Sequence, residues 1–170
     1  MKADRRVRLL VMTALFAAPS AAATLVIRIP SPSGGYMNLG DTVVLMGAYL
    51  LGGRYGVAAG AIGPALADFI SGYGVYVPGT LCIKALMALA AWLISRAFNR
   101  KPLALVLSGA AAEAVMIGGY WLYDTLLSGS ALTAAAGIAS NLVQGAFSII
   151  VSVPLTLALR RKLSLVKAEK

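Results

Sequence analysis

The 170-residue chain contains no histidine and only one cysteine, Cys82. Without histidine it can form neither a Ser-His-Asp triad nor an HExxH zinc site. A single cysteine excludes an internal disulfide and a thiolate metal cluster, and its apolar surroundings predict a small buried hydrophobic residue. The chain also lacks GxxxxGK[ST], so it does not bind ATP through a P-loop. These absences argue against an enzyme, and we expect no catalytic residue, metal or cofactor.

Charged residues are scarce, at 12% of the chain, which is about half of the usual share. Hydrophobic residues make up 59%, and the mean hydropathy is +0.83. This balance is typical of an integral membrane protein. The net charge is +9, but the cations gather at the chain ends and in short loops. Because they form no basic face, we do not expect nucleic-acid binding.

Six apolar segments predict an all-α integral membrane protein, in which residues 1–170 form one compact domain of six transmembrane helices. Each crossing needs roughly 20 apolar residues, so six crossings use about 120 and leave room only for short loops and tails. The second segment is short, and we expect it to be tilted, broken or re-entrant. The expected spans are about 7–27, 39–51, 55–70, 78–97, 103–127 and 134–159.

A secretory signal peptide is the alternative interpretation of the first segment. Four basic residues among the first eight would form its positive region, Leu9–Ala18 its apolar region, and Ala21–Ala23 its cleavage site. However, the apolar run continues to Ile27, and the rest of the chain is itself membrane-like. We therefore expect an uncleaved first span.

The Lys and Arg residues predict the topology. With the N-terminus in the cytoplasm, only Arg28 and Lys84 fall in the outer half of the protein. This asymmetry predicts a multi-pass protein of the cell membrane with both termini in the cytoplasm. The thirteen cations on the cytoplasmic side are Lys2, Arg5, Arg6, Arg8, Arg54, Arg96, Arg100, Lys101, Arg160, Arg161, Lys162, Lys167 and Lys170.

Polar residues from several segments fall at one depth, toward the outer face. A charge within the hydrocarbon costs at least about 2.5 kcal/mol, so such residues usually pair, face the bundle interior or line a wet cavity. We therefore predict a polar pocket, open to the outside, for a small polar ring-shaped ligand. The candidate substrate-binding residues are Asn38, Asp41, Asp68, Tyr73, Tyr76, Lys84, Glu113, Tyr120, Trp121, Asn141 and Gln144.

Helical spacing supports a shared pocket. Glu113, Tyr120 and Asp124 lie on one face of the fifth segment, and Asp124 marks the outer end of that segment. A similar polar stripe follows one face of the sixth segment; it consists of Asn141, Gln144, Ser148 and Ser152.

Most candidates also have a purely structural interpretation. Tyrosines and Trp121 suit an interfacial aromatic belt, and aspartates at span ends suit solvated loops. Lys84 could snorkel outward or pair with an aspartate, whereas Asn141 and Gln144 could hold helices together. Glu113 is the hardest to explain in this way, because acids at mid-membrane depth are usually functional.

Small residues at helical spacing predict two close helix contacts. Ala14, Ala18 and Ala22 form an AxxxAxxxA ridge on the first segment, which would let a partner helix approach closely. A second set is expected to bring the second and third segments together; it consists of Gly52, Gly56, Gly60 and Gly63.

The stretch from Tyr36 to Ser95 resembles the substrate-binding S components of energy-coupling factor (ECF) transporters, in the riboflavin, hydroxymethylpyrimidine and pyridoxine branch. The last two segments match only in general character. The resemblance rests on the pattern "NLGD…GxxYG…ALAD…GY…P.T..IK", whose residues include Asn38, Asp41, Gly53, Tyr55, Gly56, Asp68, Tyr73, Pro78, Thr80 and Lys84.

This resemblance implies a subunit that captures a vitamin or precursor from outside, and that works with a membrane coupling (T) protein and two cytoplasmic ATPases. It also implies that Ala14, Ala18 and Ala22 match the family's docking face for the coupling protein. We expect pyridoxine or hydroxymethylpyrimidine as the cargo, and riboflavin next. The alternative is a self-sufficient proton-coupled secondary transporter with Glu113 and the aspartates as its relay.

Overall fold

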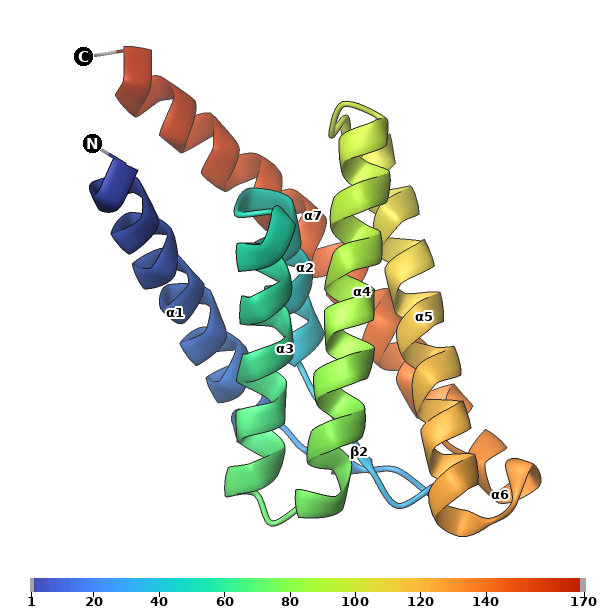
Figure 1. The fold of residues 1–170 in the computed structure, drawn as a ribbon. Helices are drawn as coiled ribbons and strands as arrows, with labels where there is room; N and C mark the ends of the chain where they lie inside the picture. Colours follow the sequence, from blue (N-terminus) through green and yellow to red (C-terminus); the bar gives the residue numbers. More distant parts are fainter. Residues whose placement is uncertain (1, 169–170) are drawn as a thin grey trace.

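The computed structural model describes the backbone of residues 2–168 and the side chains of residues 6–161. Within this range the protein is a helical bundle with one short hairpin (Figure 1), so the predicted all-α membrane fold is confirmed. The elements are α1 (Lys2–Val26), β1 (Ile29–Pro30), β2 (Tyr36–Met37), α2 (Gly40–Leu50), α3 (Gly53–Ile70), a 3₁₀ turn (Gly74–Tyr76), α4 (Val77–Ala97), α5 (Pro102–Ser128), α6 (Ala131–Ala135) and α7 (Ile138–Ala168).

Four helical segments of the described chain are long and apolar enough to cross a membrane. They are Arg6–Val26, Gly74–Ala97, Pro102–Ser128 and Ala131–Arg161. Their outward faces carry large apolar side chains, such as Leu86, which is 56% exposed, and Ile150, which is 70% exposed. Exposed apolar surface on this scale is stable against lipid rather than water.

The second segment forms the short helix α2 at the centre of the bundle. With 11 residues it is about 16 Å long, and it contacts α1, α3, α4 and α7. Val44, Leu45, Ala48 and Tyr49 are all buried, and they form part of the hydrophobic core. Helix α2 is therefore enclosed by longer helices instead of facing the lipid over its whole length.

Glycines on α3 allow the closest helix contacts. A Cβ on Gly56 would lie 2.8 Å from the Gly47 carbonyl oxygen of α2, as the predicted contact between these segments requires. A Cβ on Gly63 would lie 2.5 Å from the Ala17 carbonyl oxygen, so this glycine packs against α1 instead. Helix α1 thus lies against the bundle through backbone contact with α3.

One sequence-based expectation is wrong, and one apolar segment has an internal break. Cys82 on α4 is exposed rather than buried, because an apolar residue of a membrane helix can face lipid as readily as the core. The last apolar segment divides into α6 and α7 near Gly137, and most of the predicted span 134–159 lies in α7. A Cβ on Gly137 would lie 2.3 Å from the Ser33 hydroxyl oxygen, so the hairpin occupies the space beside the break.

The two ends of the bundle differ in chemistry. The start of α1, the end of α7 and the α2–α3 and α4–α5 connections lie at one end, whereas the hairpin, the α3–α4 connection and α6 lie at the other (Figure 1). We call these the terminal end and the hairpin end. Arg54, Arg100 and Lys101 belong to connections at the terminal end. Of the other cations counted above, the side chains of Lys2, Arg5, Lys162 and Lys167, and the whole of Lys170, lie outside the described residues.

Candidate functional site

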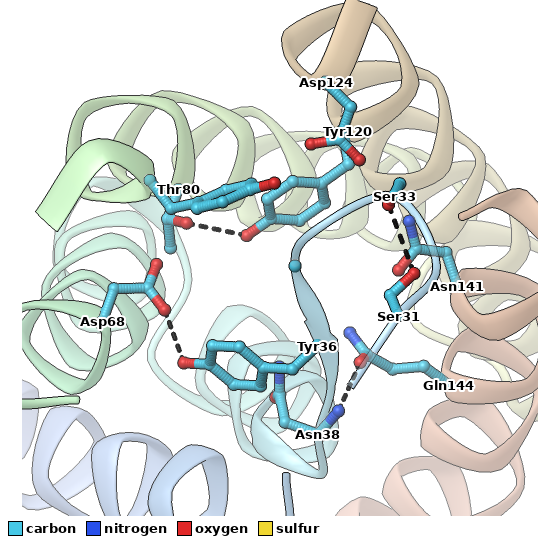
Figure 2. Close-up of a pocket in the computed structure, with 12 residues that line it drawn as sticks. Ser31, Ser33, Tyr36, Asn38, Asp68, Thr80, Tyr120, Asp124, Asn141 and Gln144 are labelled. Atoms are coloured by element: carbon cyan, nitrogen blue, oxygen red, sulfur yellow. Dashed lines mark hydrogen bonds between the residues drawn. The ribbon is translucent and has the colours of Figure 1, made fainter. Parts of the chain in front are cut away.

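A polar cavity lies at the hairpin end of the bundle (Figure 2). Its volume is about 30 Å³, which is room for one or two water molecules. A vitamin-sized ring can therefore enter only if part of the lining moves. The lining comes from the hairpin and from α3, α4, α5 and α7, and it consists of Ser31, Ser33, Gly35, Tyr36, Asn38, Asp68, Tyr76, Thr80, Tyr120, Asp124, Asn141 and Gln144.

The hairpin covers the cavity and is attached to the bundle by few bonds. Its turn closes through the Ser31 N–H, which donates to the Gly35 carbonyl oxygen at 2.8 Å. The backbone of Gly34 has a φ of +106°, which side chains rarely tolerate. The hydroxyls of Ser31 and Ser140 are 2.9 Å apart and join the hairpin to α7. A cover held in this way can open at modest cost.

Tyr36 of β2 connects the hairpin to α3. Its hydroxyl donates to Asp68 Oδ1 at 2.5 Å. Burial and the Asp68 carboxylate raise the pKa of Tyr36, so the phenol keeps its proton and remains a donor at neutral pH. The Tyr36 ring also packs on Tyr73, with centroids 4.8 Å apart, and Tyr73 contacts Tyr76 at 6.1 Å. These rings form an aromatic row beside the cavity.

A buried ion pair forms the floor beneath the cavity. The Lys84 ammonium of α4 donates to Asp41 Oδ1, and both side chains are almost fully buried. The Gln144 amide of α7 donates to Asp41 Oδ2 at 2.6 Å, and its own oxygen accepts from the Asn38 N–H at 2.6 Å. Asn38 Oδ1 in turn accepts from the Gly40 N–H at 2.8 Å, at the start of α2. This floor network joins three helices to the exit of the hairpin.

The wall formed by α4 and α5 combines an aromatic ring with a carboxylate. The hydroxyls of Thr80 and Tyr120 are 2.9 Å apart, and the Lys84 ammonium lies 5.2 Å from the centroid of the Tyr120 ring. One turn further along α5, Asp124 is 4% exposed. Its Oδ1 atom accepts no hydrogen bond from any residue whose side chain the structure describes. Asp124 therefore presents an unsatisfied acceptor at the cavity.

The structure brings most of the predicted site residues together. Asp41 and Lys84 lie directly beneath the cavity in the floor network, and Tyr73 lies behind Tyr36. The predicted residues that line the cavity itself are Asn38, Asp68, Tyr76, Tyr120, Asn141 and Gln144. Their contact with a ligand stays a prediction.

Two further predicted residues, Trp121 and Glu113, neither line the cavity nor form hydrogen bonds in the floor network. Trp121 is 40% exposed and donates its indole N–H to the Ala131 carbonyl oxygen at 3.1 Å. It points away because it neighbours Tyr120 in sequence, and adjacent residues of a helix face different directions. Glu113 is 3% exposed, and neither of its carboxylate oxygens has a hydrogen-bond partner among the described side chains. It lies deeper in the bundle, against Gly145 of α7.

The sequence reasoning missed half of the lining. Thr80 carried a usable signal, because it lies one helical turn before Lys84 and shares its face. Asp124 was placed at the correct end of its helix but was not assigned to the site. The hairpin residues gave no periodic signal, since a turn has none. The residues that were missed are Ser31, Ser33, Gly35, Tyr36, Thr80 and Asp124.

Comparisons with known proteins give a consistent result. The family model of the ECF-type riboflavin transporter S component matches residues 5–161. A protein of Pyrococcus woesei, described as an uncharacterized protein in gap 3′ region, is 34% identical over 144 residues; the match covers 82% of this chain and 93% of that protein. A solved structure described as the S component of a bacterial ECF transporter has a TM-score of 0.73 at 18% identity. The match covers 93% of this chain and 98% of the chain in that structure. At that identity the likeness shows the fold.

Proposed function

The chain belongs to the family of ECF-type riboflavin transporter S components, and from that premise we propose that it captures a small water-soluble vitamin or vitamin precursor for import. Partner subunits would supply the energy by hydrolysing ATP. The family is one of transporter subunits rather than of enzymes, and the chain is a multi-pass membrane protein. Binding is therefore non-covalent, and the cargo leaves chemically unchanged.

The observation that carries this proposal is the polar cavity beneath the hairpin. Tyrosine rings and groups that form hydrogen bonds surround one hollow at the end of an otherwise apolar bundle. Such a lining suits a small ring with polar substituents. We place pyridoxine or hydroxymethylpyrimidine first, because a single ring requires the smaller displacement of the lining. Riboflavin comes second, since its fused three-ring system needs more space.

We propose that the hairpin end faces the outside and that both termini lie in the cytoplasm of the cell. The separation of the cations supports this orientation, because Arg54, Arg100 and Lys101 lie at the terminal end. In this orientation the hairpin separates the cavity from the external medium. Cargo therefore enters from outside when the hairpin moves.

The outer face of α1 is proposed to dock the membrane coupling protein, which in turn carries the two ATPases. Ala14, Ala18 and Ala22 are all exposed, whereas Ser20 and Ala21 face the bundle and are buried. The AxxxAxxxA ridge is thus unoccupied by α2 and α3, which pack on the other side of α1. A ridge of small side chains lets a partner helix approach closely.

Mass spectrometry of the purified protein tests the capture function. The protein is extracted in a mild detergent, denatured, and searched for released small molecules. A vitamin retained at close to one molecule per chain would support the proposal and identify the cargo. If no vitamin is retained and titration with pyridoxine, hydroxymethylpyrimidine and riboflavin gives no binding, the proposal is wrong.

One observation favours the second candidate function, a proton-coupled secondary transporter. Glu113 is buried without a hydrogen-bond partner among the described residues, and buried membrane acids commonly carry protons in pumps and transporters. Uptake into liposomes that contain this chain alone distinguishes the two candidates. Uptake that needs no ATPase and stops when a protonophore is added would favour the secondary transporter.

A further inference from the structure

The charges around the cavity indicate which chemical form of the cargo it accepts. We propose that the cavity selects a cargo with a protonated amine or an amino-substituted ring, that Asp124 receives this group, and that phosphorylated forms are rejected. This inference rests on the capture function proposed above, and it names the chemical class of the cargo.

The described lining is acidic. It contains two carboxylates, Asp68 and Asp124, and neither lysine nor arginine. The nearest buried cation, Lys84, is already paired with Asp41 in the floor network. Arg28, at the base of the hairpin, is exposed and does not line the cavity. The field inside the cavity therefore favours a positive group on the cargo.

The two carboxylates differ in how well they are satisfied. Asp68 accepts a hydrogen bond from Tyr36 and interacts with Thr80 and Lys84. Asp124 interacts with the Tyr76 hydroxyl as a hydrogen-bond partner, but its buried Oδ1 atom has no donor within hydrogen-bond distance among the described side chains. A buried carboxylate oxygen without a donor is costly, so a donor on the cargo gains more at Asp124 than at Asp68.

Figure 2 shows that Asp68 and Asp124 lie on opposite sides of the cavity. The remaining polar groups are hydroxyls and amides, which can either donate or accept. They adapt to the cargo, whereas a carboxylate accepts only. The two carboxylates therefore determine whether the cavity accepts a positive or a negative group on the cargo.

A phosphate group would find no suitable partner here. Phosphate sites in proteins use Arg or Lys, or the free N–H groups at a helix N-terminus. At the start of α2, which borders the cavity, the Gly40 N–H already donates to Asn38 Oδ1, and Asp41 occupies the first turn. A phosphate would instead meet Asp68 and Asp124, and like charges repel.

Three probes that share one ring test this inference by isothermal titration calorimetry at pH 7. Pyridoxamine carries an ammonium group, pyridoxine has a hydroxyl in its place, and pyridoxine 5′-phosphate adds negative charge. We expect pyridoxamine to bind about tenfold more tightly than pyridoxine, because either group can donate to the carboxylate but only the ammonium adds Coulomb attraction. We expect the phosphate to bind more weakly than pyridoxine.

Variants assign the selectivity to one residue. Asp124→Asn keeps the size of the side chain but removes its charge, and we expect the preference for pyridoxamine to fall to within about threefold. Arg28→Gln serves as the matched control. It also changes the charge of the protein by one unit at the hairpin end, but Arg28 does not line the cavity. Its preference should stay close to that of the unmodified protein, since exposed charges are largely screened.

The outcomes separate this inference from the capture function. If pyridoxine 5′-phosphate or riboflavin binds tightly and Asp124→Asn leaves the order of the probes unchanged, the inference is wrong and vitamin capture stands. If Asp124→Asn and Arg28→Gln reduce the preference equally, the role of Asp124 is wrong. If the three probes, hydroxymethylpyrimidine and riboflavin all fail to bind, both the capture function and the inference are overturned.

Discussion

Replacement of Lys84 by methionine is the sharpest test of the floor network. The side chain is 1% exposed and Asp41 is fully buried. Lys84→Met therefore leaves the Asp41 carboxylate with one remaining side-chain donor, the Gln144 amide. Removal of one partner of a buried ion pair costs about 3–5 kcal/mol, because the other charge stays buried and uncompensated.

The double variant distinguishes loss of the pair from loss of packing. Asp41→Asn combined with Lys84→Met removes both charges and leaves no buried ion without its partner. We expect the double variant to be more stable than Lys84→Met alone, although it contains more changes. Arg28→Gln is the control for removal of an exposed cation, and it should change the free energy of unfolding by no more than about 0.5 kcal/mol.

The free energy of unfolding can be measured by SDS titration of the protein in mixed micelles, with the fluorescence of Trp92 and Trp121 as the signal. A loss of less than about 1 kcal/mol in Lys84→Met, the range of an exposed ion pair, would contradict the reasoning. So would a double variant whose loss equals the sum of the two single losses. Either result would mean that the pair is solvated or is not formed in the folded protein.

Four further substitutions test the helices and the hairpin. Ala18→Phe on the exposed ridge of α1 should abolish co-purification with the coupling protein and leave vitamin affinity unchanged; unchanged assembly would remove α1 as the docking face. Gly63→Ala places a Cβ 2.5 Å from the Ala17 carbonyl oxygen and should destabilise the protein by about 1–3 kcal/mol. Gly118→Ala, which meets no atom within 4 Å, should be neutral or stabilising by up to about 1 kcal/mol in the same SDS titration. Tyr36→Phe removes the donor to Asp68 and should speed dissociation of bound vitamin about tenfold in a stopped-flow assay; an unchanged rate would mean that this bond does not hold the hairpin closed.

The helices were predictable because hydrophobic length and helical periodicity act locally. The segment predicted at 78–97 became α4 (Val77–Ala97) with a shift of one residue, since Pro78 marks a helix start and the apolar run has a clear end. The inward faces of α5 and α7 followed from spacing alone, and Glu113, Gln144 and Ser148 are all buried. Lipid requires polar groups to gather inside, so their convergence was also predictable.

The hairpin and its contacts were not predictable in the same way. Between Arg28 and Asn38 the chain folds back through a glycine turn, and the side chains of this turn meet α7 more than 100 residues away in sequence. The bond between Ser31 and Ser140 is one such contact. A single sequence carries no periodic signal for a pairing of this kind. The exposure of Cys82 was missed for another reason, because hydrophobicity alone does not distinguish a side chain that faces lipid from one in the core.

The short helix α2 brings two polar regions of the protein closer together than the thickness of a bilayer. The helix covers about 16 Å, whereas the hydrocarbon core of a bilayer is about 30 Å thick. One end of α2 meets the floor network through Asp41, and at the other end the Arg160 guanidinium donates to the Tyr49 carbonyl oxygen at 3.0 Å. Polar groups therefore lie at both ends of α2, with Asp41 at one end and the Arg160 guanidinium at the other. Under the proposed capture function, a cargo held above Asp41 would be separated from the opposite polar region by roughly half a bilayer.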